Sequence, residues 1–371
     1  MKTTYTFSIR NIVGIMLFSL ISALGFVSCE DNEDPVDPGF DRSAMLESVA
    51  NNLIIPNFES LQASVTNLSN AATTFTQTAN EENLVALRTA WVQAAKDHQH
   101  CSAFGFGPAE LLLGPYASVL GVFPISEEKV ERNILATDFD LANSFDRDVR
   151  GFYAVEYLIY RNGVSDTEII ASFDQERKDY LLLIVQELKD TFDGIVDEWS
   201  STYLTQFVNS NGTSAGSSIS LYYNEFVKDY ENIKNFKVEL PAGLSAGQES
   251  ADGSLVEAFY SGISRELIQE HFANSKNIWM GRSRNGRSII GFQAYLESVE
   301  GGPALVASTK DAISKIDNAI TALPQGPLSD NVSASELEVL RDELQANTAN
   351  FKSSMSSLLG ISITFNSGDG D

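Results

Sequence analysis

The sequence has little cysteine and little histidine, and it lacks the common catalytic and nucleotide-binding motifs. Its 371 residues include two cysteines and three histidines. No His-Glu-x-x-His helix, Gly-x-Ser-x-Gly elbow or phosphate loop occurs, so the commonest hydrolase and nucleotide-binding signatures are excluded. The cysteines are Cys29 and Cys101. If Cys29 is modified, no intrachain disulfide can form, and the fold must be held by packing.

Basic residues are also scarce. There are 25 Lys and Arg residues against 50 Asp and Glu, which gives a formal net charge of −25. Such a surface repels phosphate backbones and anionic lipid headgroups, so neither nucleic-acid binding nor membrane attachment by charge alone is expected. The classes of binding partner that this charge does not disfavour are cations, basic ligands and uncharged molecules. Because 43% of the residues are hydrophobic and 10% aromatic, the chain is expected to form a globular protein.

The amino terminus is typical of an exported protein. A polar, basic start is followed by an apolar run over 11–27, which is short for a membrane-spanning helix and typical of a signal peptide. The run leads into FVSC at 26–29, which resembles a bacterial lipoprotein cleavage box. We therefore predict a signal peptide over 1–28 and lipidation of Cys29, whose acyl chains would anchor the protein in the outer membrane.

An acidic, proline-containing stretch follows the predicted lipid anchor. Its composition predicts an extended linker over 29–40. Acidic residues directly behind a lipidated cysteine also resemble the surface-export signal of some Gram-negative lipoproteins, so a plain spacer and an export signal both remain open. The predicted location is that of an exported outer-membrane lipoprotein, facing either the periplasm or the cell exterior.

Apolar residues recur at helical spacing and rarely alternate, which predicts an all-α protein. We predict two up-and-down helical bundles, over 41–235 and 254–371, joined by a glycine-rich linker over 236–253. GFYA at 151–154 recurs as GFQA at 291–294, and this echo indicates that one bundle duplicates the other. The clearest apolar stripes are Leu181, Ile184, Val185, Leu188 and Phe192, then Ile313, Ile316, Ile320 and Leu323, then Leu337, Leu340 and Leu344.

Short sequence patterns also predict where some helices begin and end. Thr78, Ser165 and Ser333 are each followed by a glutamate three residues later, the capping-box pattern that predicts a helix start. Gly360 predicts a helix stop after Leu359.

One carboxylate lies in an otherwise uncharged helical segment. Between Arg150 and Arg161 the single charge is Glu156, and at helical spacing it shares a stripe with Tyr153 and other tyrosines. We predict that this carboxylate is buried, and a buried carboxylate must be paired or hydrogen-bonded. Two interpretations remain open: a structural acid satisfied by a neighbour, or a functional group with a perturbed pKa.

Several blocks of the sequence resemble the imelysin-like family. The blocks that carry the resemblance occur in family order: WVQAAKDHQHCSAFGFGP from 91, GFYAVEYLIY from 151, PAG from 241 with EAFYSGIS from 257, and the ending from LGI at 359 to DGD at 371. The resemblance implies a helical fold of two bundles in an exported, lipid-anchored or periplasmic protein. Some members of the family are classed as peptidases and others are linked to iron uptake.

The resemblance also implies a site. The family motif is Gly-x-His-x-x-Glu, and this chain has Tyr153 where the motif has histidine and Glu156 where it has glutamate. Ser102 stands where the family often has an acid. The matched blocks place a ligand site on Tyr153, Glu156, Ser102, Glu257 and Ser261. Because a neutral phenol is a poor zinc ligand, we predict a binding protein without catalytic activity.

Divalent metal binding, by iron or zinc, remains an alternative. The candidate ligands are Glu156, His98 and His100, with Cys101 one helical turn from His98. Two or three ligands on one turn do not complete a zinc site, so we favour solvated or capping residues over metal ligands as the interpretation of these histidines. His271 stands alone in the sequence and is predicted to be structural.

A basic loop interrupts the acidic sequence. Arg282, Arg284 and Arg287 lie in GRSRNGR from 281. Their guanidinium groups could bind an anion or carboxylate, or they could neutralise acids across the interface between the bundles.

Together these features predict a lipid-anchored, imelysin-like surface or periplasmic binding protein that serves iron or haem acquisition. The expected partners are the outer membrane, through the lipid anchor, and an unidentified small ligand or protein, without nucleic acid. The alternatives are an imelysin-type metallopeptidase that uses Glu156 and a purely structural surface lipoprotein.

Overall fold

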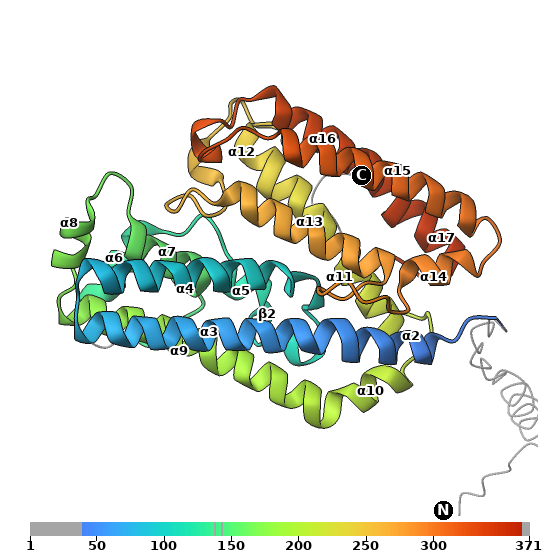
Figure 1. Cartoon of the computed structure of the whole chain (residues 1–371), viewed down its shortest axis with the longest axis horizontal. Helices are drawn as coiled ribbons and strands as arrows, with labels where there is room; N and C mark the ends of the chain where they lie inside the picture. The colour runs from blue at the N-terminus through green and yellow to red at the C-terminus, as the bar shows by residue number, and fades with distance from the viewer. Residues whose placement is uncertain (1–38, 137–138, 142–143, 366–371) are drawn as a thin grey trace, which may run out of the picture. The chain divides into compact units, whose positions relative to one another are not determined.

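The computed structural model describes residues 39–136, 139–141 and 144–365 (Figure 1). The predicted signal peptide, Cys29 and most of the acidic linker lie outside these ranges, as does the end of the last family block. From Gly39 onward the chain forms one compact unit.

Helices dominate the described chain, so the predicted all-α fold is confirmed. The α-helices are α2 (Arg42–Val49), α3 (Ile55–Gln77), α4 (Glu81–Gln99), α5 (Ala117–Leu120), α6 (Glu127–Leu135), α7 (Gly151–Tyr160), α8 (Asp166–Ala171), α9 (Gln175–Glu198), α10 (Leu204–Asn209), α11 (Ser218–Asn232), α12 (Leu240–Ala242), α13 (Ser264–Met280), α14 (Phe292–Glu297), α15 (Gly302–Ala322), α16 (Ser335–Thr348) and α17 (Met355–Leu359). Short 3₁₀ turns are η2 (Ser102–Phe104), η3 (Gly107–Ala109), η7 (Gly253–Leu255) and η8 (Leu328–Asp330). Two-residue strands β1 (Glu110–Leu111) and β2 (Gly114–Pro115) pair antiparallel, with Leu111 opposite Gly114.

Several long helices contain a π-helical segment. These segments are η1 (Ala50–Ile54), η5 (Trp199–Tyr203), η6 (Ile233–Glu239) and η9 (Ala349–Ser354). A π segment adds a residue to one turn and rotates the side chains that follow, and such segments often occur at functional sites. The segment η6 also extends its helix to Ala242, so the loop predicted from residue 236 begins later, at Gly243.

The helices form two groups. The long helices α3, α4 and α9 pack side by side, and α7 packs against α4 and α9. In the second group α15 packs on α16, and α13 contacts both α14 and α15. The groups meet where α13 packs against α4, above α3 in the view of Figure 1. The predicted domain boundary and duplication stay predictions.

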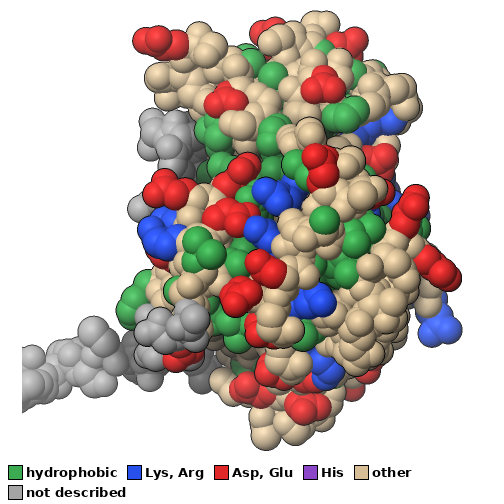
Figure 2. Space-filling model, turned by 90° about the vertical axis from the view of Figure 1, so that its left-hand side faces the viewer, with side chains coloured by type: hydrophobic (Ala, Val, Ile, Leu, Met, Phe, Trp, Pro, Cys, Tyr) green, Lys and Arg blue, Asp and Glu red, His purple; other side chains and the backbone are tan. Residues whose placement is uncertain are grey.

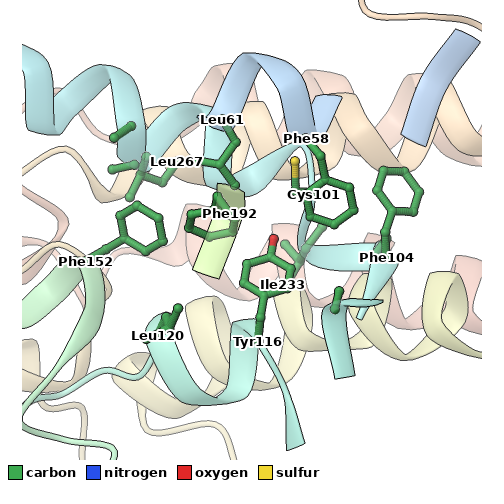
Figure 3. Close-up of a cluster of buried hydrophobic side chains, with 14 of the residues drawn as sticks. Phe58, Leu61, Cys101, Phe104, Tyr116, Leu120, Phe152, Phe192, Ile233 and Leu267 are labelled. Atoms are coloured by element: carbon green, nitrogen blue, oxygen red, sulfur yellow. The ribbon is translucent and has the colours of Figure 1, made fainter. Parts of the chain in front are cut away.

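The core holds the predicted apolar stripes. Phe192 of the α9 stripe lies with Phe58, Tyr116 and Phe152 in a cluster of buried side chains shown in Figure 3. Rings of this cluster meet edge to face, with 5.3 Å between the centroids of Tyr116 and Phe192, a preferred aromatic geometry. Cys101 is fully buried in the same cluster (Figure 3). It is therefore a core residue.

Of the three predicted capping boxes, one has the expected geometry. Ser165 and Glu168 form a reciprocal capping box at the start of α8. The prediction at Thr78 is wrong, because the side chain of Asn80 caps α4 by accepting from the backbone N–H of Asn83 at 2.8 Å. The prediction at Ser333 is also wrong, because α16 starts at Ser335 without a side-chain cap. Gly360 adopts φ +63° directly after Leu359, as predicted for a helix stop.

The surface mixes charges of both signs. Figure 2 shows acidic and basic side chains interspersed with hydrophobic ones on the face that it draws. Within the described ranges, no helix combines the length and the apolar character needed to cross a bilayer.

Candidate functional site

A group of polar side chains is buried where the end of α4 meets α7, α11, η6, α13 and the segment before α13. These elements come from distant parts of the sequence and each supplies one or two polar groups. The members, which we call the buried polar network, are Gln99, Ser102, Tyr153, Asp229, Lys237, Glu257 and His271.

Glu257 is the centre of one half of the network. Its carboxylate is 3% exposed, and it accepts hydrogen bonds from the Tyr153 hydroxyl and, at 3.1 Å, from the Gln99 amide. The Lys237 ammonium lies 2.8 Å from the second carboxylate oxygen and also donates to the Gln99 carbonyl. Lys237 is 6% exposed, so both charges of this ion pair are withdrawn from water, and each depends on the other for its neutralisation.

The other half of the network joins Ser102, Asp229 and His271. One Asp229 carboxylate oxygen lies 3.1 Å from the Ser102 hydroxyl and 2.7 Å from Nε2 of His271. Burial lowers the pKa of His271, against the opposing charge of Asp229, so the ring is neutral at pH 7 and donates through its Nε2 proton.

This serine, histidine and aspartate do not form a catalytic triad. In a triad the serine and the carboxylate bond to opposite ring nitrogens, so that the histidine can accept the serine proton. Here the Ser102 hydroxyl lies 3.4 Å from the same Nε2 that faces Asp229. The Ser102 hydroxyl instead donates to the Asp229 carboxylate, so His271 is not placed to accept the serine proton as it does in a triad.

Glu156 lies beside the network in a separate contact. Its side chain is 1% exposed and accepts a 2.7 Å hydrogen bond from the backbone N–H of Ser261. Burial raises the pKa of Glu156 to about 7, and the hydrogen bonds from Ser261 oppose this rise. The adjoining cavity, shared with Tyr153, has a volume of about 20 Å³, which is room for about one water molecule.

A larger cavity opens onto the network. It has a volume of about 440 Å³, and every network member except Tyr153 lines it, together with apolar side chains such as Phe123 and Phe236. Phe236 is 52% exposed. Small-molecule sites commonly combine an apolar wall with a few convergent polar groups in about 300–1,000 Å³, and this cavity has both features.

The structure brings some predicted site residues together and separates others. Tyr153, Ser102 and Glu257 belong to the buried polar network, while Glu156 and Ser261 pair beside it. Sequence reasoning missed Gln99, Asp229 and Lys237. Lys237 lies at a position expected to be a loop, and no sequence signal marks a lysine as buried.

The two candidate histidine ligands point to different neighbours. The ring of His98 stacks on Phe152, with 4.6 Å between ring centroids, and burial lowers its pKa to about 3. His100 lies 2.8 Å from the Glu270 carboxylate through its Nε2. These two rings therefore do not converge.

The residues that the structure describes do not form a divalent-metal site. Among the described residues no three His, Cys, Asp or Glu side chains are placed to hold a metal ion. The Glu257 carboxylate already faces the ammonium of Lys237, which occupies the position where a cation would bind.

Comparisons with known proteins agree with this architecture. The imelysin family model matches residues 54–355. Iron-regulated protein A of Synechococcus elongatus is 21% identical over 293 residues, which is 78% of each chain.

Solved structures share the fold. An iron-regulated protein A precursor from Parabacteroides distasonis superposes with a TM-score of 0.73 at 18% identity, covering 88% of this chain and 97% of its own. An imelysin-like protein from Psychrobacter arcticum gives a TM-score of 0.70 at 20% identity with the same coverage.

Proposed function

Because the chain belongs to the imelysin family, we propose that it is an exported, lipid-anchored protein that binds a small ligand in the cavity over the buried polar network. The observation that carries the proposal is the combination of a 440 Å³ cavity with fixed polar groups on its inner wall. Fixed donors and acceptors give a pocket its selectivity, because a ligand that fails to pair with them leaves buried polar groups unsatisfied.

Iron or haem acquisition is the role that we propose for this binding. A relative from Synechococcus elongatus and one from Parabacteroides distasonis both carry iron regulation in their names. Since the cavity already contains its own cation, Lys237, a complexed form of iron suits it better than a bare ion.

A metallopeptidase is the second candidate, and the pKa of Glu156 is the observation that favours it. A carboxylate with a pKa near 7 is suited to exchange protons at neutral pH. The size of the cavity beside Glu156 argues against a peptidase. It has room for about one water molecule, which is too little for a peptide substrate. Stoichiometric zinc in protein purified without chelator, together with cleavage of an unfolded protein substrate, would favour the peptidase over the binding protein.

We expect the protein to bind haemin or ferric citrate in isothermal titration calorimetry. Phe236→Ala should weaken this binding roughly tenfold, because it removes apolar contact at the cavity wall. Val339→Ala is the matched control, since Val339 is 53% exposed and does not line the cavity. If neither probe binds, or if both variants weaken binding equally, the proposed ligand class is wrong.

We also expect Cys29→Ser to release the protein from the membrane. The serine cannot carry the acyl chains that the sequence predicts on Cys29, and the acidic surface offers no electrostatic substitute. Fractionation of cells expressing each form measures the change. A Cys29→Ser protein that stays in the membrane fraction as firmly as the parent would show that the anchor lies elsewhere.

A further inference from the structure

A second, polar pocket lies away from the buried polar network. It has a volume of about 350 Å³ and is bounded by the helix containing η1 and α3 on one side and by the loop after α13 on the other. Its lining includes no acidic and no aromatic side chain. The groups that matter for recognition are Asn51, Asn52, Asn57, Ser60, Arg284 and Arg287.

The helical wall presents a row of amides. Asn51 and Asn52 lie in the π segment η1, and both are exposed. Their amide nitrogens are held by backbone carbonyls one turn back, at 3.0 and 2.9 Å. This leaves their carbonyl oxygens as acceptors. Asn57 is 2% exposed and is fixed by a 2.8 Å bond from its amide to the backbone carbonyl of His100.

The opposite wall is a tight, preformed turn. The backbone N–H of Ser283 donates to the carbonyl of Arg287 at 2.9 Å, and Gly286 adopts φ +83°, which favours glycine. The loop is attached to α2 because the N–H of Ile290 donates to the Ser48 hydroxyl at 3.1 Å. The two walls are therefore held in register before any ligand binds.

The charge on this turn is unusual for so acidic a protein. Arg284 pairs with the buried carboxylate of Asp97, as expected if the loop neutralises an acid. Arg287 differs, because within the described chain its guanidinium forms no ion pair and no side-chain hydrogen bond. A guanidinium that faces a pocket without acids, in a chain with twice as many acids as bases, is available for an external anion.

We propose that this pocket binds a small hydroxylated anion, a sugar acid or a sugar phosphate. The guanidinium of Arg287 would take the carboxylate or phosphate, while the asparagine and serine side chains would pair with hydroxyl groups. The absence of aromatic and acidic groups from the lining disfavours flat apolar ligands and cations. The volume suits a molecule of one or two sugar rings.

The test is calorimetric titration of the full chain with glucuronate, glucose 6-phosphate, neutral glucose and inorganic phosphate. We expect at least one charged sugar to bind, with an affinity that falls as salt concentration rises. Glucuronate and glucose 6-phosphate distinguish a carboxylate ligand from a phosphate ligand. Arg287→Gln should weaken the binding about tenfold or more. Arg282→Gln is the matched control, because Arg282 is exposed on the same loop but does not line the pocket.

The proposal would be overturned by no binding of either charged sugar, by equal binding of neutral glucose, or by equal weakening in the two arginine variants. Strong binding of inorganic phosphate alone would also overturn it, since the asparagine wall would then have no role. The pocket shares no lining residue with the cavity over the buried polar network, so this test succeeds or fails independently of the proposed function.

Discussion

Replacing Lys237 by methionine should lower the free energy of unfolding by about 3–5 kcal/mol, the usual cost of removing one partner of a buried ion pair. Glu257 is 3% exposed in the parent protein, and in the variant its carboxylate would lack a counter-charge. The remaining hydrogen bonds, from Tyr153 and Gln99, are made by neutral donors, and they offset part of a buried negative charge but do not neutralise it. Urea denaturation at pH 7, followed by circular dichroism, measures the loss.

Two further variants test whether the loss of stability is due to the buried ion pair. The double variant Lys237→Met/Glu257→Gln removes both charges and should recover most of the lost stability, because the buried charge that causes the loss is gone. Lys315→Met removes a lysine from an exposed pair with Asp311 and should leave the stability nearly unchanged, because exposed ion pairs contribute little to folding. If Lys237→Met costs as little as Lys315→Met, the ion pair with Glu257 is not buried in solution.

The second large effect is a pH dependence of the free energy of unfolding, which we expect from Glu156. Its pKa rises from an ordinary value of 4.5 to about 7 on burial, so the native state binds the proton more tightly than the unfolded chain. Stability from this group is fully present below pH 4.5 and is lost as pH rises through 7. The loss amounts to about 3 kcal/mol, since each pKa unit corresponds to about 1.4 kcal/mol.

Glu156→Gln should remove this pH dependence. A glutamine keeps a carbonyl oxygen that can accept the bond from Ser261, and it cannot ionise. Relative to the parent, the variant should therefore gain stability between pH 4.5 and 8. Glu168→Gln is the control: the capping bonds from Ser165 lower the pKa of Glu168, so its titration falls below this window. Parallel stability curves for the parent and Glu156→Gln would mean that Glu156 is ionised freely in the native state.

The sequence predicts the helices well because the signal for a helix is local. Leu181, Ile184 and Leu188 repeat at helical spacing, and the structure buries all three. Capping is less predictable, because several residues near a helix start can cap it: Thr78 and Asn80 are both suitable, and only packing decides that Asn80 does so. The resemblance to the imelysin family is confirmed, since it rests on blocks spread along the chain.

The buried polar network could be predicted only in part. Tyr153 and Glu257 were identified from family blocks, but their contact joins residues 104 positions apart, and that of Lys237 with Gln99 joins residues 138 positions apart. Such contacts depend on how α4, η6 and the segment before α13 pack together. The spacing of apolar residues along the sequence does not predict this packing. The π segment η6 adds a second difficulty, because it shifts the helical face on which Lys237 lies away from regular spacing.

The burial of Cys101 makes it an internal reporter of unfolding. Its thiol is fully buried, and burial raises its pKa well above the usual value, so a thiol reagent cannot reach a reactive thiolate in the native state. Labelling must wait for the core around Phe58 and Phe104 to open. At low reagent concentration the labelling rate would then follow the fraction of molecules with an open core. Each variant described above could thus be ranked in stability under native conditions, without denaturant, by the rate at which the Cys101 thiol becomes modified.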